Sequence, residues 1–335
     1  MAWEKVKDIL RPDMEKVFMG EMKVDESKCN KCGLCIKNCV FRAWKFGPNG
    51  FPVMKEVHEC FSCFNCMVAC PQDAISIVDQ YHVTDGFWKT IPYPLPVKLP
   101  LDPKDEDGNP TEWNEVEKTV FTRRSVRNFK DKPVPEAIIQ RIIEAGRFAP
   151  TGANCQPWKF IVITDKVLIK KIDKEVTGMM DFVYKAYTND ETVKNLIPIV
   201  EAMGPGTVDP RIIYGGMGGV LNNEDMTVTF NAPVLILMCG DERSAGSLEM
   251  HIGICGQNMI LVAKSLGIGV CWNGFIGTLL DRTSLRRKLG IKKPWKFVSC
   301  LCLGYPKFKQ EGIVPREYRP ITWYREGKEG PEMQE

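Results

Sequence analysis

Eight of the fourteen cysteines in this chain of 335 residues lie in two short runs, and these runs constrain the N-terminal fold more than any other feature. Both runs have the spacing Cys-x2-Cys-x2-Cys-x3-Cys; their members are Cys29, Cys32, Cys35 and Cys39, then Cys60, Cys63, Cys66 and Cys70. Three thiolates this close in sequence can hold three corners of a cubane iron–sulfur cluster, while a more distant cysteine closes the fourth corner. The spacing therefore predicts two [4Fe-4S] clusters.

Zinc and disulfides fit these runs less well. Zinc ligands come in pairs, whereas each run offers four cysteines and has no histidine at ligand spacing. Disulfides need an oxidising compartment, but the N-terminus, MAWEKVKDIL, has neither the basic nor the apolar region of a secretory signal. We therefore expect a cytoplasmic protein from an organism that tolerates oxygen-sensitive clusters, such as an anaerobe.

The runs, with Pro71 directly after the second, resemble those of bacterial two-cluster ferredoxins. The resemblance implies that the fourth cysteine of each run ligates the other cluster. One cluster would then be held by Cys29, Cys32, Cys35 and Cys70, and the other by Cys60, Cys63, Cys66 and Cys39. Val40 stands where a proline usually follows the first run, at a position that supplies no ligand.

Changes in composition predict three parts. Residues 1–90 contain both runs, a hairpin around residues 47–50 and a short strand in AISIVD. Residues 91–118 are rich in proline and predict a semi-rigid linker or arm, whose apolar side chains could lie along a neighbouring surface: Leu95, Val97, Leu99 and Leu101. Residues 119–335 form the predicted second domain.

Composition also limits the partners. A hydrophobic content of 44% suffices for two cores, and a net charge of +3 gives no reason to expect nucleic acid or a membrane surface. The longest apolar stretch, residues 254–272, is interrupted by Gln257, Asn258 and Lys264, so it is a poor membrane span.

The second domain begins with FTRRSVRNF, which places two guanidinium groups and a hydroxyl within five residues: Arg123, Ser125 and Arg127. Such donors suit a terminal phosphate, although a basic run can also be a solvated face. Apolar residues at helical spacing then predict a helix from Glu136 that stops at Pro150. The polar turn after it could admit a planar heteroaromatic ring, and residues 160–164 predict a strand.

Four motifs in order, RRSVRNF, APTGANCQPWKF, GVCWNGFIG and LGYP, resemble the nitroreductase family of flavin enzymes over residues 118–320. The resemblance implies an α+β fold with a central mixed sheet, in which the N-terminal cluster module precedes the flavin domain. It also implies a homodimer with a helical interface and one FMN in each of two interfacial sites.

Carried over from that family, the phosphate and ribityl contacts fall on Arg123, Ser125 and Arg127. The isoalloxazine contacts, partly from the other subunit, fall on Pro150, Thr151, Asn154 and Gln156. Trp272, Asn273 and Gly274 match the turn that presents a backbone N–H to flavin N5, although Asn273 stands where an acidic residue is common. Either Arg316 or Arg319 would be a late phosphate ligand. His251 is either structural or a proton donor.

These parts predict an FMN-dependent reductase in which two [4Fe-4S] clusters relay electrons to FMN. The acceptor would be a small conjugated molecule such as a nitroaromatic, quinone or enone, and the donor a soluble ferredoxin or NAD(P)H. One alternative is an NAD(P)H-oxidising flavoprotein that passes electrons out through the clusters; another is a redox-sensing or electron-transfer module without a dedicated substrate. Residues 178–230 are predicted to form a substrate lid, or else a helical hairpin that fills the core.

Overall fold

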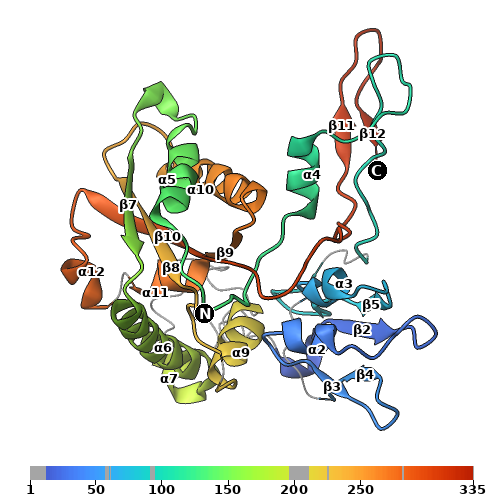
Figure 1. Cartoon of the computed structure of the whole chain (residues 1–335), viewed down its shortest axis with the longest axis horizontal. Helices are drawn as coiled ribbons and strands as arrows, with labels where there is room; N and C mark the ends of the chain where they lie inside the picture. Colours follow the sequence, from blue (N-terminus) through green and yellow to red (C-terminus); the bar gives the residue numbers. More distant parts are fainter. Residues whose placement is uncertain are drawn as a thin grey trace.

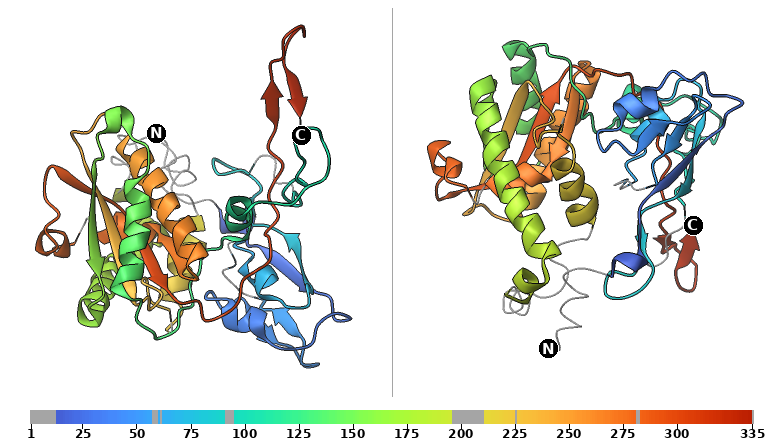
Figure 2. Two further views of the ribbon diagram at one scale, coloured as in Figure 1. Left: turned by 45° about the horizontal axis from the view of Figure 1, so that its top comes forward. Right: turned by 90° about the horizontal axis from the view of Figure 1, so that it is seen from below.

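A computed structural model shows two domains side by side and an arm that projects away from both (Figures 1 and 2). The smaller, cysteine-rich domain extends to residue 90, and the larger domain follows the arm. The structure describes residues 13–56, 60, 62–90, 95–195, 211–224, 226–280 and 283–334. No helix among these residues is both long and apolar enough to cross a membrane.

The cysteine-rich domain is built from short strand pairs and two one-turn helices. Its elements are η1 (Met14–Lys16), β1 (Val17–Phe18), β2 (Glu21–Val24), α2 (Leu34–Asn38), β3 (Trp44–Phe46), β4 (Pro52–Met54), α3 (Asn65–Ala69), β5 (Ile75–Asp79) and β6 (His82–Val83). The predicted hairpin is confirmed as β3–β4, and the AISIVD strand is β5, paired antiparallel with β2. Each helix ends directly before the fourth cysteine of its run, which is Cys39 after α2 and Cys70 after α3.

The larger domain has a four-stranded sheet in the order β7-β8-β10-β9. The strands are β7 (Trp158–Ile163), β8 (Val234–Asp241), β9 (Gly269–Asn273) and β10 (Trp295–Gly304). All three pairings are antiparallel, and the parallel component of the sheet is a single bridge between Ser125 and Val270 beside β9. The domain is therefore α+β, and parallel pairing is added to the antiparallel sheet at the β9 edge.

Helices cover both faces of this sheet (Figure 2). One face carries α5 (Glu136–Arg147) and α10 (Leu248–Ser265); the other carries α6 (Lys166–Thr188), η3 (Arg211–Met217), α9 (Gly218–Leu221) and α11 (Gly274–Leu280). Two short helices complete the domain, α7 (Asp190–Asn195) and α12 (Leu285–Lys288). Because strand side chains alternate, Leu235 and Leu237 pack on the α6 side while Ile236 packs on the α5 side.

The predicted helix after Pro135 is confirmed as α5, which buries Ile139 and Ile142 and ends at Arg147, three residues before Pro150. It packs closely on α10, because a Cβ on Gly146 would lie 2.8 Å from Met259 Cγ. This close approach fixes the helical layer on one side of the sheet.

The described flanks of the predicted lid have both buried and exposed apolar side chains. Met180, Ile213 and Met217 are buried in the core cluster on the α6 face, whereas Phe182 is 68% exposed. Residues 196–210, the centre of the predicted lid, lie outside the described residues.

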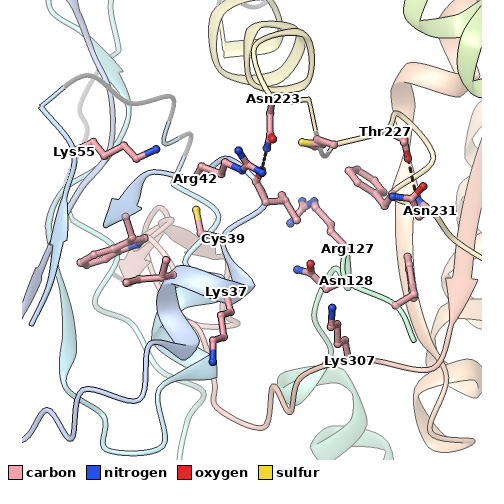
Figure 3. A pocket seen from close by; sticks show the side chains of 16 residues that line it. Lys37, Cys39, Arg42, Lys55, Arg127, Asn128, Asn223, Thr227, Asn231 and Lys307 are labelled. Atoms are coloured by element: carbon pink, nitrogen blue, oxygen red, sulfur yellow. Dashed lines mark hydrogen bonds between the residues drawn. The ribbon is translucent and has the colours of Figure 1, made fainter. Parts of the chain in front are cut away.

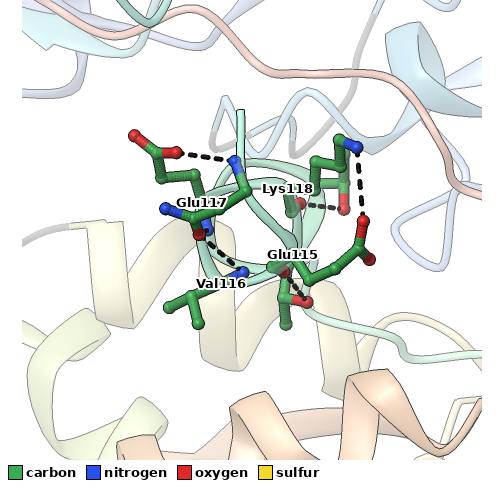
Figure 4. A network of polar contacts seen from close by, with 7 residues as sticks. Glu115, Val116, Glu117 and Lys118 are labelled. Atoms are coloured by element: carbon green, nitrogen blue, oxygen red, sulfur yellow. Dashed lines mark hydrogen bonds and ion pairs between the residues drawn. The ribbon is translucent and has the colours of Figure 1, made fainter. Parts of the chain in front are cut away.

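The arm differs from the prediction in two ways. Helix α4 (Glu115–Thr122) begins inside the predicted linker, because Asn114 and Glu117 form a reciprocal capping box at its N-terminus (Figure 4). The apolar side chains expected to lie on a neighbouring surface are exposed instead, with Leu101 at 74%. The arm pairs with the C-terminal segment through a bridge between Lys98 and Arg316, beyond which β11 (Ile321–Trp323) and β12 (Glu332–Gln334) form a projecting hairpin.

Candidate active site

Two hollows in the cysteine-rich domain each receive four cysteines, three from one run and the last of the other run. The outer hollow is lined by Cys29, Cys32, Cys35 and Cys70. The inner hollow is lined by Cys39, Cys60, Cys63 and Cys66. The fourth cysteine of each run lines the hollow of the other run, because a one-turn helix separates it from the first three cysteines of its own run. Each hollow thus offers four thiols, which is the donor set that a cubane cluster requires.

A cubane binds each cysteine through a different iron, so its ligands stand further apart than the ligands of one ion. No group of three or more His, Cys, Asp or Glu among the described residues is arranged to hold a single metal ion. Burial raises the pKa of Cys39 to about 11 and the pKa of Cys60 to about 12. Because thiolates are the ligands of iron, binding of a cluster would release the protons of these thiols.

The inner hollow lies against the larger domain through Arg124, a residue to which the sequence assigned no role. Its Nη2 donates to the carbonyl oxygen of Cys63 at 2.7 Å and to Asn65 Oδ1 at 3.0 Å. In return, Asn65 Nδ2 donates to the carbonyl oxygen of Ser125 at 3.0 Å. Burial lowers the pKa of Arg124 to about 10, which leaves it charged at neutral pH. The pair joins the middle of the second cysteine run to the RRSVRNF motif.

A second set of amides crosses the same boundary at the end of α2. Asn38 Nδ2 donates to the carbonyl oxygen of Asn65 at 3.0 Å, which ties the two one-turn helices together. Asn128 Nδ2 donates to the carbonyl oxygen of Asn38 at 3.1 Å, and Gln310 Nε2 donates to Asn38 Oδ1 at 3.1 Å. Asn38 and Asn65 are only 4% and 5% exposed, so their polar groups depend on these bonds. Nothing in the local sequence marks them, because their partners are far along the chain.

A cluster of arginine residues at the β9 edge includes Arg123, one of the predicted phosphate residues. Val126 N donates to the carbonyl oxygen of Val270 at 3.0 Å, and this bond places Arg123 and Ser125 beside β9. Burial, together with the nearby positive charge of Arg316, lowers the pKa of Arg123. Arg123, Arg124 and Arg316 repel one another there, so an anion among them would relieve the repulsion. This surrounding fits a flavin phosphate.

The structure separates the two candidates for the late cationic ligand. Arg316 lies near Arg123 and Arg124, whose pKa values it lowers. Arg319 instead forms an ion pair with Glu317. Of the two, Arg316 is the one that belongs to the arginine cluster.

Arg127 lies beside this cluster, because its positive charge, like those of Arg123 and Arg316, lowers the pKa of Arg124. Its guanidinium hydrogen-bonds the side chain of Cys271 on β9, and it also lines the inner hollow. Arg127 therefore lies between the cysteines of one domain and the sheet of the other.

The WNG turn joins the end of β9 to the start of α11, and its residues differ in burial. Asn273 is 2% exposed; its Nδ2 donates to the carbonyl oxygen of Val228 at 2.6 Å and its Oδ1 accepts from Ile276 N at 3.1 Å. Its side chain therefore orders the start of α11, and an amide can do this by both donating and accepting. Gly274 is exposed, and Trp272 packs closely over Gly256 of α10.

Of the predicted isoalloxazine residues, Pro150, Asn154 and Gln156 are exposed and Thr151 is half-buried, in the turn that follows α5. The turn η2 (Gly152–Asn154) holds Ala153 and Asn154 at φ of 50° and 53°, a strained conformation for residues with a side chain. Gly152 N donates to His251 Nε2 at 3.1 Å, and His251 is 2% exposed. Nε2 of His251 thus supports the turn, while Nδ1 of His251 is buried with no hydrogen-bond partner among the described residues. The arginine motif, by contrast, lies beside β9.

A cysteine-rich domain with paired four-cysteine hollows, joined to an α+β domain with an arginine cluster at the sheet edge, defines a flavin-dependent oxidoreductase with an iron–sulfur domain. The family model described as Nitroreductase family matches residues 120–305, more than half of the chain, so the chain belongs to the nitroreductase family. A model described as 4Fe-4S dicluster domain matches residues 21–72.

Relatives agree with this family. Two proteins, each named "Putative NADH dehydrogenase/NAD(P)H nitroreductase", are from Archaeoglobus fulgidus and Methanothermobacter thermautotrophicus. The first is 27% identical over 198 residues, which cover 58% of this chain and 87% of that protein. The second is 28% identical over 204 residues, which cover 60% and 81%. A nitroreductase structure with bound FMN from Bacteroides fragilis is 25% identical, covers 64% of this chain and 97% of its own, and has a TM-score of 0.44.

Proposed function

We propose that this chain is a homodimeric FMN-dependent reductase in which two [4Fe-4S] clusters relay electrons to FMN. FMN would then pass two electrons to a small conjugated acceptor such as a nitroaromatic, quinone or enone. The observation that carries this proposal is the contact of Arg124 with Cys63, because it places a cysteine hollow directly against the predicted flavin motif.

The eight cysteines would hold the clusters in the groups that line the two hollows. The outer hollow includes Cys32, which is exposed, so a soluble ferredoxin could donate electrons there. The inner hollow is lined by Arg127, which makes it the neighbour of the flavin domain. Transfer would therefore run from the outer to the inner hollow and then across the interface held by Arg124 and Asn65.

FMN, when bound, accepts single electrons and passes two to an organic acceptor. In our proposal Arg123, Ser125 and Arg316 hold its phosphate, and Arg127 lies toward its ring. The backbone N–H of Gly274 would face N5, with Asn273 fixing the turn and Trp272 beside it. Pro150, Thr151, Asn154 and Gln156 would come from the partner subunit.

The projecting arm supports the homodimer. Its exposed apolar side chains, which include Leu101 at 74% and Tyr324 at 80%, form a surface that one chain leaves uncovered. A second copy would cover it. Sedimentation of a variant lacking residues 320–335 tests this, because the deletion removes Tyr324 but keeps Arg316. We expect it to give monomers with weakened flavin binding.

The name that the two relatives share favours a second candidate, in which NAD(P)H reduces FMN and the clusters pass electrons out to a protein. Anaerobic stopped-flow separates the two. Reduced ferredoxin and NAD(P)H are mixed separately with the purified protein while the flavin and cluster absorbance is followed. We expect ferredoxin to reduce the clusters before the flavin. Fast flavin reduction by NAD(P)H that survives removal of the clusters would reverse the proposed direction.

A further inference from the structure

A cleft lies between the two domains, and several lysine and arginine side chains line it. Its cationic side chains are Lys37, Arg42, Lys55, Arg127 and Lys307. None of the described residues that line it carries a carboxylate. Cationic side chains gathered in one cleft attract an anion.

The walls of the cleft come from both domains and are held by hydrogen bonds. Asn223 Nδ2 donates to the carbonyl oxygen of Val40 at 2.6 Å, which joins the loop after α9 to the end of the first cysteine run. Lys307 N donates to the carbonyl oxygen of Asn128 at 3.0 Å. Figure 3 shows Arg42 and Arg127 reaching into the same space from opposite sides. The cleft is thus preformed.

Its size and remaining lining indicate an organic ligand. The volume is about 480 Å³, within the range of small-molecule pockets. Amide groups of Asn128 and Asn231 offer neutral donors, while Phe129 and Phe230 offer apolar ring surfaces. A small molecule with two or more phosphate or carboxylate groups and a flat body would match all of these features.

We propose that this interdomain cleft is a binding site for a small organic polyanion, separate from the Arg123–Arg316 cluster. Lys55 and Lys307 contact the anionic groups from the two domains. Because Cys39 also lines the cleft, the bound anion lies at the edge of the inner hollow. If the proposed function holds, occupancy lowers the reduction potential of the inner cluster, since negative charge nearby disfavours an added electron.

Calorimetric titration of the flavin-saturated protein with inorganic pyrophosphate, ADP and citrate tests the site. We expect saturable binding, with ADP tighter than pyrophosphate because of the aromatic walls. Lys55→Gln and Lys307→Gln should each weaken it about tenfold. Lys45→Gln is the matched control, because Lys45 is exposed on β3 and does not line the cleft. Preference for pyrophosphate over citrate identifies a phosphorylated ligand, and the reverse identifies a polycarboxylate.

Absence of saturable binding for all three probes would overturn the proposed site. The same would follow if Lys45→Gln weakened binding of the probes as much as Lys55→Gln and Lys307→Gln do. Arg316→Gln distinguishes this inference from the proposed function. It should weaken FMN binding and leave the dissociation constant of pyrophosphate unchanged. A change in that constant would assign the anion to the arginine cluster instead of the cleft.

Discussion

The outer and inner hollows have the same cysteine spacing but different surroundings. The described residues that line the outer hollow, including Cys29 and Cys32, all belong to the cysteine-rich domain. The inner hollow is also lined by Arg127, and the carbonyl group of Cys63 accepts from Arg124. Two clusters with the same set of cysteine ligands would therefore have different positions in an electron relay, because the inner hollow contacts the larger domain.

The largest effect is expected from breaking one hollow at a time. Cys32→Ala and Cys63→Ala should each lose one cluster and about half of the bound iron. In Cys63→Ala, flavin reduction by reduced ferredoxin should cease, because the remaining cluster is the outer one. In Cys32→Ala, a small reductant such as reduced methyl viologen should still reduce the flavin through the inner cluster. Iron assay, electron paramagnetic resonance and stopped-flow measure these outcomes.

Cys155→Ala is the control, because Cys155 is exposed and lines neither hollow. Equal flavin reduction rates in the two cluster variants, with both donors, would remove the distinction between an outer and an inner position.

Arg124→Gln should break the interface while leaving both hollows filled. The substitution deprives the carbonyl group of Cys63 and the side chain of Asn65 of a charged donor, at a cost of about 1.5–3 kcal/mol. We expect unchanged iron content, a shifted midpoint potential for one cluster and slower flavin reduction by ferredoxin. Arg147→Gln, on the surface of α5, is the control. Two unshifted potentials and an unchanged rate would contradict a role for Arg124 at the inner hollow.

Arg316→Gln and Arg319→Gln extend the comparison to the flavin side of the interface. Arg316 lies in the arginine cluster, whereas Arg319 pairs with Glu317. We expect FMN affinity to fall about tenfold or more in Arg316→Gln and to stay unchanged in Arg319→Gln, as measured by flavin fluorescence. The opposite order would move the phosphate site to Arg319.

The smallest effect is expected at Gly256, beneath Trp272. A Cβ there would lie 2.3 Å from Trp272 Cζ3, so Gly256→Ala must displace the ring, at about 1–3 kcal/mol. Gly253→Ala on the same helix meets nothing within 4 Å and should not destabilise the protein. The test compares the thermal unfolding and the flavin affinity of the two variants. Equal unfolding temperatures and equal affinities would mean that the position of Trp272 over Gly256 affects neither stability nor flavin binding.

Several features followed from the sequence because they depend on neighbours in the chain. The β3–β4 hairpin and helix α5 are of this kind, since turn residues and apolar spacing act locally. The arm was predicted less well. Its alternating apolar residues suggested a docked segment, but Leu101 and Val97 are exposed, and covering them requires contacts that a single chain does not provide.

The sequence by itself determined the cysteine spacing and the four flavin motifs, because ligand number and motif chemistry are written in short stretches. Only the tertiary structure decided which hollow borders the larger domain, that Arg124 and Asn65 join the two, and that Arg316 rather than Arg319 lies beside Arg123. The physical reason is distance along the chain. Arg124 and Asn65 are 59 residues apart, and their bond exists only because the fold buries both in one interface.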